Sequence, residues 1–177
     1  MESPRVYMRW AKPIDIPAFT EIEELCFAYP WSAAEFKAHM KFRGCVSMAA
    51  EVDGKVIGYL IYQLSPSRIS ICNLAVAPEF QRHGYGRQMI EWLKRKLTGR
   101  TGRRLVTADL RERNVCGCIF FRAVGFRCVN IFHGFYDETD ESAYHFHFKV
   151  KPNPNAALTV PTSEDLIPEV EVESDGQ

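Results

Sequence analysis

The sequence has no long apolar run and no excess of charge of either sign. No stretch free of Asp, Glu, Lys and Arg is longer than the twelve residues 56–67, whereas a membrane-spanning helix needs about 18 or more. Arg9, Lys12 and Asp15 interrupt the apolar positions near the start, so we expect no secretory signal. Twenty-two basic and 22 acidic side chains cancel, which argues against a dedicated nucleic-acid binder.

The sequence also lacks a cysteine framework. Its six cysteines are scattered through apolar segments and form no C-x-x-C pair. They are Cys26, Cys45, Cys72, Cys116, Cys118 and Cys128. We therefore expect buried, reduced thiols in a cytoplasmic protein, and no metal site.

The cancelling charges are unevenly distributed along the 177 residues. No Lys or Arg occurs from Pro152 onward, although that segment holds six acidic residues and four prolines. Such a composition cannot bury enough apolar surface to offset the entropy cost of ordering, so we expect a disordered acidic tail over 152–177. We expect residues 1–151 to form one domain; they carry 22 basic and 16 acidic side chains, a net charge of +6.

Hydrophobic periodicity predicts the element order β-α-α-β-β-β-α-β-α-β-β, a mixed α/β domain without repeats. Two local signals are strong: Asp53-Gly54 predicts a hairpin, and Ser32 with Glu35 predicts a capping box. The predicted strands are 5–11, 45–52, 55–64, 69–77, 104–110, 126–132 and 144–150. The predicted helices are 13–28, one that begins after Ser32, 84–97 and 114–124.

The segment from Asn73 to Arg87 runs from an apolar strand through a glycine-containing turn into a helix. Gly84 and Gly86 lack the Cβ atoms that would block a close approach of the backbone. The new helix adds unpaired N–H groups and the positive end of its dipole. Together they predict an anion cradle suited to a pyrophosphate, although the spacing is neither a Walker loop nor a dinucleotide fingerprint.

The turn Gln81-Arg82-His83-Gly84-Tyr85-Gly86 resembles the Q/R-x-x-G-x-G/A signature of the GCN5-related N-acetyltransferase (GNAT) superfamily, whose amides hold the pyrophosphate of acetyl-CoA. Further segments resemble RimI-type ribosomal-protein alanine N-acetyltransferases in order and spacing, over about residues 5–150. These segments are 28–32, 73–76, 111–114 and 120–126. The resemblance implies that 1–151 is a GNAT domain, with a mostly antiparallel mixed sheet flanked by helices. It also implies a bulge that splays the strand ending near Val76 from the one ending near Leu110.

The resemblance further implies roles for individual residues. The backbone of three residues would bind the pantetheine arm: Leu74, Ala75 and Val76. The pyrophosphate would lie on Arg82, His83, Gly84, Tyr85, Gly86 and Arg87, and the cofactor would also contact Asn114. The acceptor peptide would be bordered by Pro30, Trp31 and Tyr136. The basic run from Lys94 to Arg104 would attract the 3′-phosphate of CoA or ribosomal RNA, or is only a solvated face.

Catalytic residues match the family pattern less well. In place of the family's general-base glutamate, Ala108 lies one position too early and Asp109 matches in register, with a side chain one methylene shorter. Asp109 is either a base that works directly or through a water, or a solvated carboxylate at a strand end. The family's general-acid tyrosine is replaced by Phe121, which we expect to pack against apolar neighbours. Tyr136 resembles a tyrosine in a loop over the substrate cleft and is either a substitute donor or a packing aromatic.

The leading hypothesis is an acetyl-CoA-dependent N-acetyltransferase that acts on a protein N-terminus, such as a ribosomal protein that begins with alanine. The amine would attack directly in a ternary complex. An α-amine with a pKa of about 7.8 is about 10 to 15% neutral at pH 7, but a lysine at about 10.4 is neutral only about 0.04% of the time, so a weak base favours the α-amine. The alternatives are acetylation of a small amine or lysine, and a CoA-binding module with little catalysis. His145 and His147 share one strand face, as a polar surface or the start of a metal site.

Overall fold

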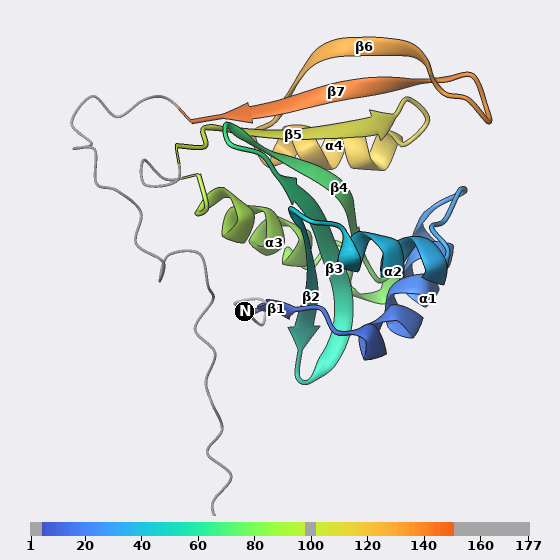
Figure 1. The fold of residues 1–177 in the computed structure, drawn as a ribbon, viewed down its shortest axis with the longest axis vertical. Coiled ribbons are helices and arrows are strands. Elements are labelled where there is room, and N and C mark those ends of the chain that lie inside the picture. Colours follow the sequence, from blue (N-terminus) through green and yellow to red (C-terminus); the bar gives the residue numbers. More distant parts are fainter. Residues whose placement is uncertain (1–4, 98–101, 151–177) are drawn as a thin grey trace, which may run out of the picture.

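The computed structural model describes residues 5–97 and 102–150; the predicted acidic tail lies outside these residues. Seven strands form one sheet in the order β1-β2-β3-β4-β5-β7-β6 (Figure 1). They are β1 (Tyr7–Trp10), β2 (Cys45–Val52), β3 (Lys55–Leu64), β4 (Arg68–Val76), β5 (Leu105–Arg111), β6 (Arg127–Tyr136) and β7 (Glu141–Lys149). The α-helices are α1 (Ile16–Cys26), α2 (Ala33–Lys41), α3 (Tyr85–Lys94) and α4 (Val115–Ala123), with short 3-10 helices at Pro13–Asp15 and Pro78–Phe80.

Local sequence signals explain the first half of the sheet. Asp53 and Gly54 adopt φ values of 51° and 76°, the left-handed conformation of the tight turn that joins β2 to β3. Ser32 Oγ accepts from the Glu35 amide, while the Glu35 carboxylate accepts from the Ser32 amide and starts α2. The predicted hairpin and capping box are therefore confirmed.

The sheet splits between β4 and β5, the one parallel pair among the described strands. The two strands pair only from Arg68 with Leu105 to Ile71 with Ala108. On the other side of β4, the register with β3 shifts so that Cys72 is an extra residue. This bulge bends β4 away from β5, and the two strands diverge in Figure 1. The predicted bulge and splayed strand pair are confirmed.

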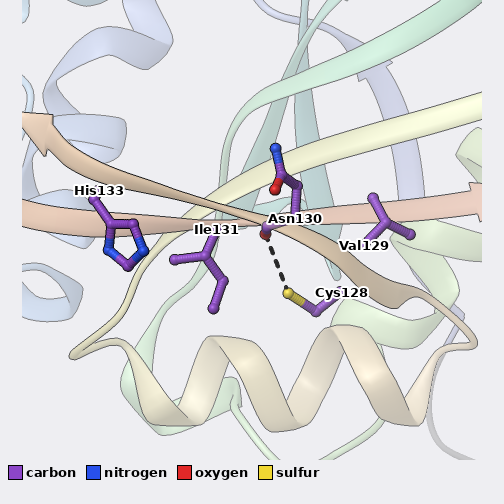
Figure 2. Close-up of a pocket in the computed structure, with 5 residues that line it drawn as sticks. All are labelled: Cys128, Val129, Asn130, Ile131 and His133. Carbon is purple, nitrogen blue, oxygen red and sulfur yellow. Dashed lines mark hydrogen bonds between the residues drawn. The ribbon is translucent and has the colours of Figure 1, made fainter.

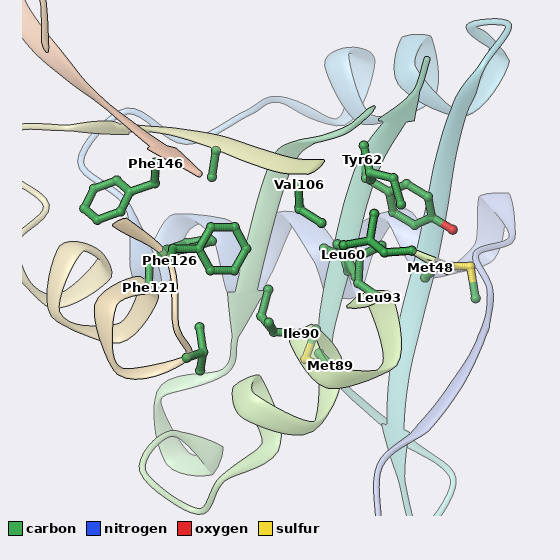
Figure 3. Close-up of a cluster of buried hydrophobic side chains, with 14 of the residues drawn as sticks. Met48, Leu60, Tyr62, Met89, Ile90, Leu93, Val106, Phe121, Phe126 and Phe146 are labelled. Atoms are coloured by element: carbon green, nitrogen blue, oxygen red, sulfur yellow. The ribbon is translucent and has the colours of Figure 1, made fainter. Parts of the chain in front are cut away.

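Two layers of helices cover the sheet. Helices α3 and α4 enclose the larger core, where Met89, Ile90 and Leu93 of α3 are fully buried and Phe121 of α4 packs near Phe146 (Figure 3). On the opposite face, α1 packs on β3 and β4, and α2 packs on β2. The faces alternate along β5, so that Val106, Ala108 and Leu110 belong to the larger core. Thr107, Asp109 and Arg111 therefore face the side of α1 and α2.

Two expectations need correction. The closing hairpin is longer than the predicted strands 126–132 and 144–150, so that Tyr136 ends β6 instead of lying in a loop. The cysteines are all free, but none is buried. Cys72 is exposed because the bulge displaces it, and Cys128 is exposed because β6 is an edge strand. In the part of the chain that is described, no helix is long and apolar enough to span a membrane.

Candidate active site

The turn before α3 has the backbone conformation expected for an anion cradle. Gly84 is the N-cap of α3 with φ of 84°, and Arg82 also has a positive φ of 66°. An L side chain at position 84 would be strained, whereas glycine adopts this conformation freely. The N–H groups of the first turn of α3 are left for an anion. At Gly86, a Cβ would lie 3.2 Å from the Phe120 ring, so this glycine also allows α3 and α4 to pack closely.

Some side chains of this turn bond within the protein, and others are exposed to solvent. Gln81 donates to the Val76 carbonyl at 2.9 Å and ties the turn to the end of β4. Arg87 donates to the Ala123 carbonyl at 3.1 Å, so its side chain caps α4. Tyr85 is buried against the sheet, whereas Arg82 and His83 are exposed. Backbone amides, with the exposed side chains beside them, are what the turn presents to an anion.

Two side chains of the predicted basic run bond within the protein, whereas Arg95 and Arg104 are exposed. Lys94 donates to Glu91 at 2.8 Å and to the Val124 carbonyl at 2.6 Å, and its ammonium lies 4.1 Å from the centre of the Phe148 ring. Arg103 donates to the Ser65 carbonyl at 2.7 Å. Residues 98–101 of this run lie outside the described residues.

Between the splay and the cradle, the edge of β4 that faces β5 pairs with no other described strand. Leu74, Ala75 and Val76 pair with β3 on one side, but β5 has already diverged on the other. The Val76 carbonyl accepts from Gln81, and Cys26 lies 3.4 Å from the same oxygen. The remaining strand edge suits an extended chain with amide groups.

Asn114, the N-cap of α4, accepts from the Gly117 amide at 2.8 Å.

Asp109 is the first residue of β5 beyond the last pair with β4. Its side chain is 38% exposed, and its Oδ1 lies 2.5 Å from Nδ1 of His145 on β7. His145 Nε2 in turn lies 2.7 Å from Nε2 of His147. Among the described residues, Oδ2 of Asp109 accepts no hydrogen bond, and the side chain as a whole is partly exposed.

Arg111 connects the two sides of the splay. Its guanidinium lies 3.7 Å from the centre of the Tyr136 ring and 4.4 Å from that of Tyr29, which precedes α2. It pairs with Glu141, which is buried, and with the exposed Glu138. Burial raises the pKa of Tyr136, opposed by Arg111 and supported by Asp109, so this phenol stays protonated at neutral pH. The structure therefore brings Asp109 and Tyr136 to the same site.

The segment before α2 is held by a buried carboxylate. Glu23 Oε1 accepts from the Trp31 amide at 3.0 Å and from the Asn73 side chain at 2.9 Å. Trp31 stacks on His39 with ring centres 4.2 Å apart, and Pro30 is exposed beside it. These contacts place Trp31, with Pro30 next to it, beside the bulge of β4.

Phe121 packs as expected. It is 6% exposed and meets Phe126 edge-on, with ring centres 5.0 Å apart. The side chain at this position therefore offers no proton to a leaving group.

A separate hollow lies along β6 and is lined by Cys128, Val129, Asn130, Ile131 and His133. Figure 2 shows Ile131 and His133 on the side of β6 where α4 lies, whereas Asn130 points to the other side. The register pairs Asn130 with His145. Because cross-strand partners face the same way, the hollow lies on the opposite face of the sheet from Asp109.

Comparison with known proteins decides the family. A model described as the acetyltransferase (GNAT) family matches residues 16–126. This chain belongs to the GNAT family. The resemblance inferred from the signature turn is thus confirmed, and the enzyme is an N-acetyltransferase with acetyl-CoA as its cosubstrate. The cradle and the unpaired edge of β4 fit the pyrophosphate and the amide-bearing arm of acetyl-CoA.

The [ribosomal protein bS18]-alanine N-acetyltransferase of Escherichia coli K12 is 29% identical to this GNAT enzyme over 126 residues, covering 71% of this chain and 84% of the relative. The crystal structure of the Escherichia coli ribosomal-protein-S18-alanine N-acetyltransferase has a TM-score of 0.73 at 24% identity, covering 86% and 98% of the two chains. Arabidopsis thaliana NAA60 in complex with acetyl-CoA has a TM-score of 0.69 at 20% identity, covering 82% and 99%. The solved structures are similar in fold.

Sequence reasoning missed three features of the site. Arg111 entered only as part of a motif, Glu23 carried no signal, and the His145–His147 pair was not connected to Asp109. Alternation had placed the two histidines on one strand face, but the register between β5 and β7 was needed to place Asp109 opposite His145.

Proposed function

We propose that this GNAT enzyme transfers the acetyl group of acetyl-CoA to the N-terminal α-amine of a protein. The observation that carries the proposal is the position of Asp109, an exposed carboxylate at the point where β4 and β5 separate. An amine that approaches β5 on the face opposite α3 and α4 would reach this carboxylate. The Escherichia coli relative, named for an alanine of ribosomal protein bS18, supports an Ala-initiated ribosomal protein as the acceptor, which would place the reaction in the cytoplasm.

Proton affinities favour an α-amine over a lysine. Acetyl-CoA supplies an acetyl thioester, and its thiolate, with a pKa of about 8.5, leaves without a strong acid. The phenylalanine at position 121 is therefore compatible with turnover. The acceptor must be neutral when it attacks, which costs about 1.2 kcal/mol for an α-amine at pH 7 but about 4.6 kcal/mol for a lysine. Because Asp109 is expected to be a weak base, it suits an acceptor whose deprotonation costs less free energy, which is the α-amine.

The test measures CoA release with a peptide that begins with Ala and contains one internal Lys. A second peptide differs only in a blocked N-terminus. We expect release with the free peptide, and a fall in kcat of about 10²- to 10³-fold in Asp109→Asn. Asp53→Asn is the matched control, because Asn-Gly suits the same turn and residue 53 is far from the splay. Equal release from both peptides would contradict an α-amine acceptor, and full activity of Asp109→Asn would remove its role.

A further inference from the structure

Three side chains form a continuous hydrogen-bonded row across β5 and β7. Asp109 lies opposite His145 in the register, and Thr107 lies opposite His147. The row begins at Asp109 Oδ1, passes through both ring nitrogens of His145, and continues to Nε2 of His147, over distances of 2.5 and 2.7 Å. It starts where the strands separate and runs away from the splay along the sheet.

The surroundings hold this row in place. His145 is 18% exposed, and its ring centre lies 5.3 Å from that of Phe132 on β6. The two imidazole rings meet edge-on at 4.5 Å. Thr107 beside the row bonds to Ser70 of β4. The row therefore has a fixed geometry on the face opposite α3 and α4.

Charged groups around the row favour a neutral His147. Burial and the neighbouring His145 lower the pKa of His147, and Arg68 of β4 and Lys149 of β7 act in the same direction. Asp109 opposes them. Arg127 of β6 is the cross-strand partner of His147 and adds a further positive charge on this face. A proton that reaches His147 is thus readily released.

A carboxylate alone is a poor acceptor for the proton of an α-ammonium group. Its ordinary pKa of about 3.9 lies roughly four units below that of an α-ammonium group, whereas imidazole at about 6.5 lies only about one unit below. A carboxylate joined to imidazoles therefore gives the proton a more favourable destination than the carboxylate by itself.

We propose that Asp109, His145 and His147 form a proton relay that takes the proton lost by the acceptor amine out of the cleft. The inference rests on the proposed function and deepens it. Asp109 touches the amine, and the two histidines are positioning residues that act through it. No feature of the GNAT signature turn requires them.

The amine nitrogen forms a bond to the acetyl carbon, the carbon–sulfur bond breaks, and the thiolate leaves with its electron pair. The row starts with an ionised Asp109 and a proton on each ring nitrogen of His145. The amine nitrogen gives its proton to Oδ2 of Asp109, which removes the negative charge beside His145. His145 then passes its Nε2 proton to Nε2 of His147, and His147 releases its Nδ1 proton to water. Water protonates the thiolate, and exchange with water returns Asp109 and the histidines to their starting forms.

The first test needs no acceptor and uses NMR spectra of the full chain with nitrogen-15-labelled histidines. The relay requires a proton on Nδ1 of His145, hydrogen-bonded to Asp109, and hence a far-downfield ring N–H signal. We expect Asp109→Asn to abolish this signal and His133→Gln to retain it. His133 is the matched control because it lies on the opposite face and bonds to Ser142. An unprotonated Nδ1 of His145, or a signal unchanged in Asp109→Asn, would overturn the relay.

The second test measures kcat and KM against pH. We expect His145→Gln to lower kcat about 10- to 100-fold with KM for acetyl-CoA unchanged, and free imidazole to restore part of the rate in His147→Ala. His133→Gln should match wild type. An active wild type whose rate and pH profile are unaltered in both histidine variants would overturn the relay and leave the proposed acceptor intact. If the downfield His145 signal is present but the wild-type enzyme does not acetylate N-terminal peptides, the result would contradict only the proposed acceptor.

Discussion

At the scale of single residues, the buried Glu23 is the least ordinary group near the site. It is 2% exposed, and its Oε2 has no partner within the described part of the chain. Burial raises the pKa of this carboxyl, although the bonds from Trp31 and Asn73 oppose the shift. The folded protein therefore holds this proton more tightly than the unfolded chain, and ionisation of Glu23 destabilises the fold.

The sign of that shift gives a prediction. Stability associated with Glu23 is present below its ordinary pKa and is lost as pH rises toward its raised pKa in the fold. Glu23→Gln cannot ionise but retains the oxygen that accepts from Trp31 and Asn73. Its Tm should therefore rise relative to that of wild type between pH 4 and pH 8, by a few degrees in thermal melts. Glu24→Gln, at the exposed neighbouring position, should show no such trend; a pH-independent difference for Glu23→Gln would contradict the shift.

Some residues of the candidate site could be predicted from the sequence, and others could not. The cradle at Gly84 follows from a contiguous motif, because its geometry depends on neighbours in the chain. The contact between Asp109 and His145 depends on pairing across 36 positions, which no local pattern encodes. The buried thiols were predicted wrongly because a bulge and an edge strand, which expose Cys72 and Cys128, are properties of the assembled sheet.

At the scale of elements, the start of α3 combines a structural and a binding requirement. Gly84→Ala should lower stability by about 1 to 2 kcal/mol, because an L residue is strained at φ of 84°. It should also reduce the rise in Tm caused by acetyl-CoA. Gly54→Ala is the matched control: φ there is 76° with open space around it, so the strain is similar but lies outside the turn before α3. Equal acetyl-CoA-induced shifts in both variants would show that the turn does not hold the cosubstrate.

Elements with strong local signals were predicted within a residue or two, and the closing hairpin was not. Asp53-Gly54 determines its turn by backbone conformation, and Ser32 determines the start of α2 by hydrogen bonds. The segment Asp137–Asp140 carries no such turn signal, and Asp140 itself has a positive φ of 53°. The extra length of β6 and β7 comes from pairing with each other, which becomes evident only in the sheet.

At the scale of the whole molecule, the charge balance separates into two opposed parts. Truncation after Lys151 removes six acidic and no basic residues and leaves a net charge of +6. If the tail screens the basic face around the cradle, the truncated enzyme should bind acetyl-CoA several-fold more tightly at low salt. The gain should vanish near 1 M salt, where the Debye length is about 3 Å. A full-length variant with the six acids changed to amides should behave like the truncation; calorimetry that finds equal affinities at low salt would rule out screening.

The short ladder between β4 and β5 also has a mechanical consequence. Within the described residues, backbone pairing joins the half-sheet β1–β4 to the half-sheet β5–β7–β6 over four residue pairs at one end of the splay. Toward the other end, the Arg111 guanidinium contacts the rings of both Tyr29 and Tyr136 and so links the two halves through side chains. A ligand along the edge of β4 that faces β5 would add backbone contacts where this ladder is absent. Bound acetyl-CoA would therefore help to hold the two half-sheets together.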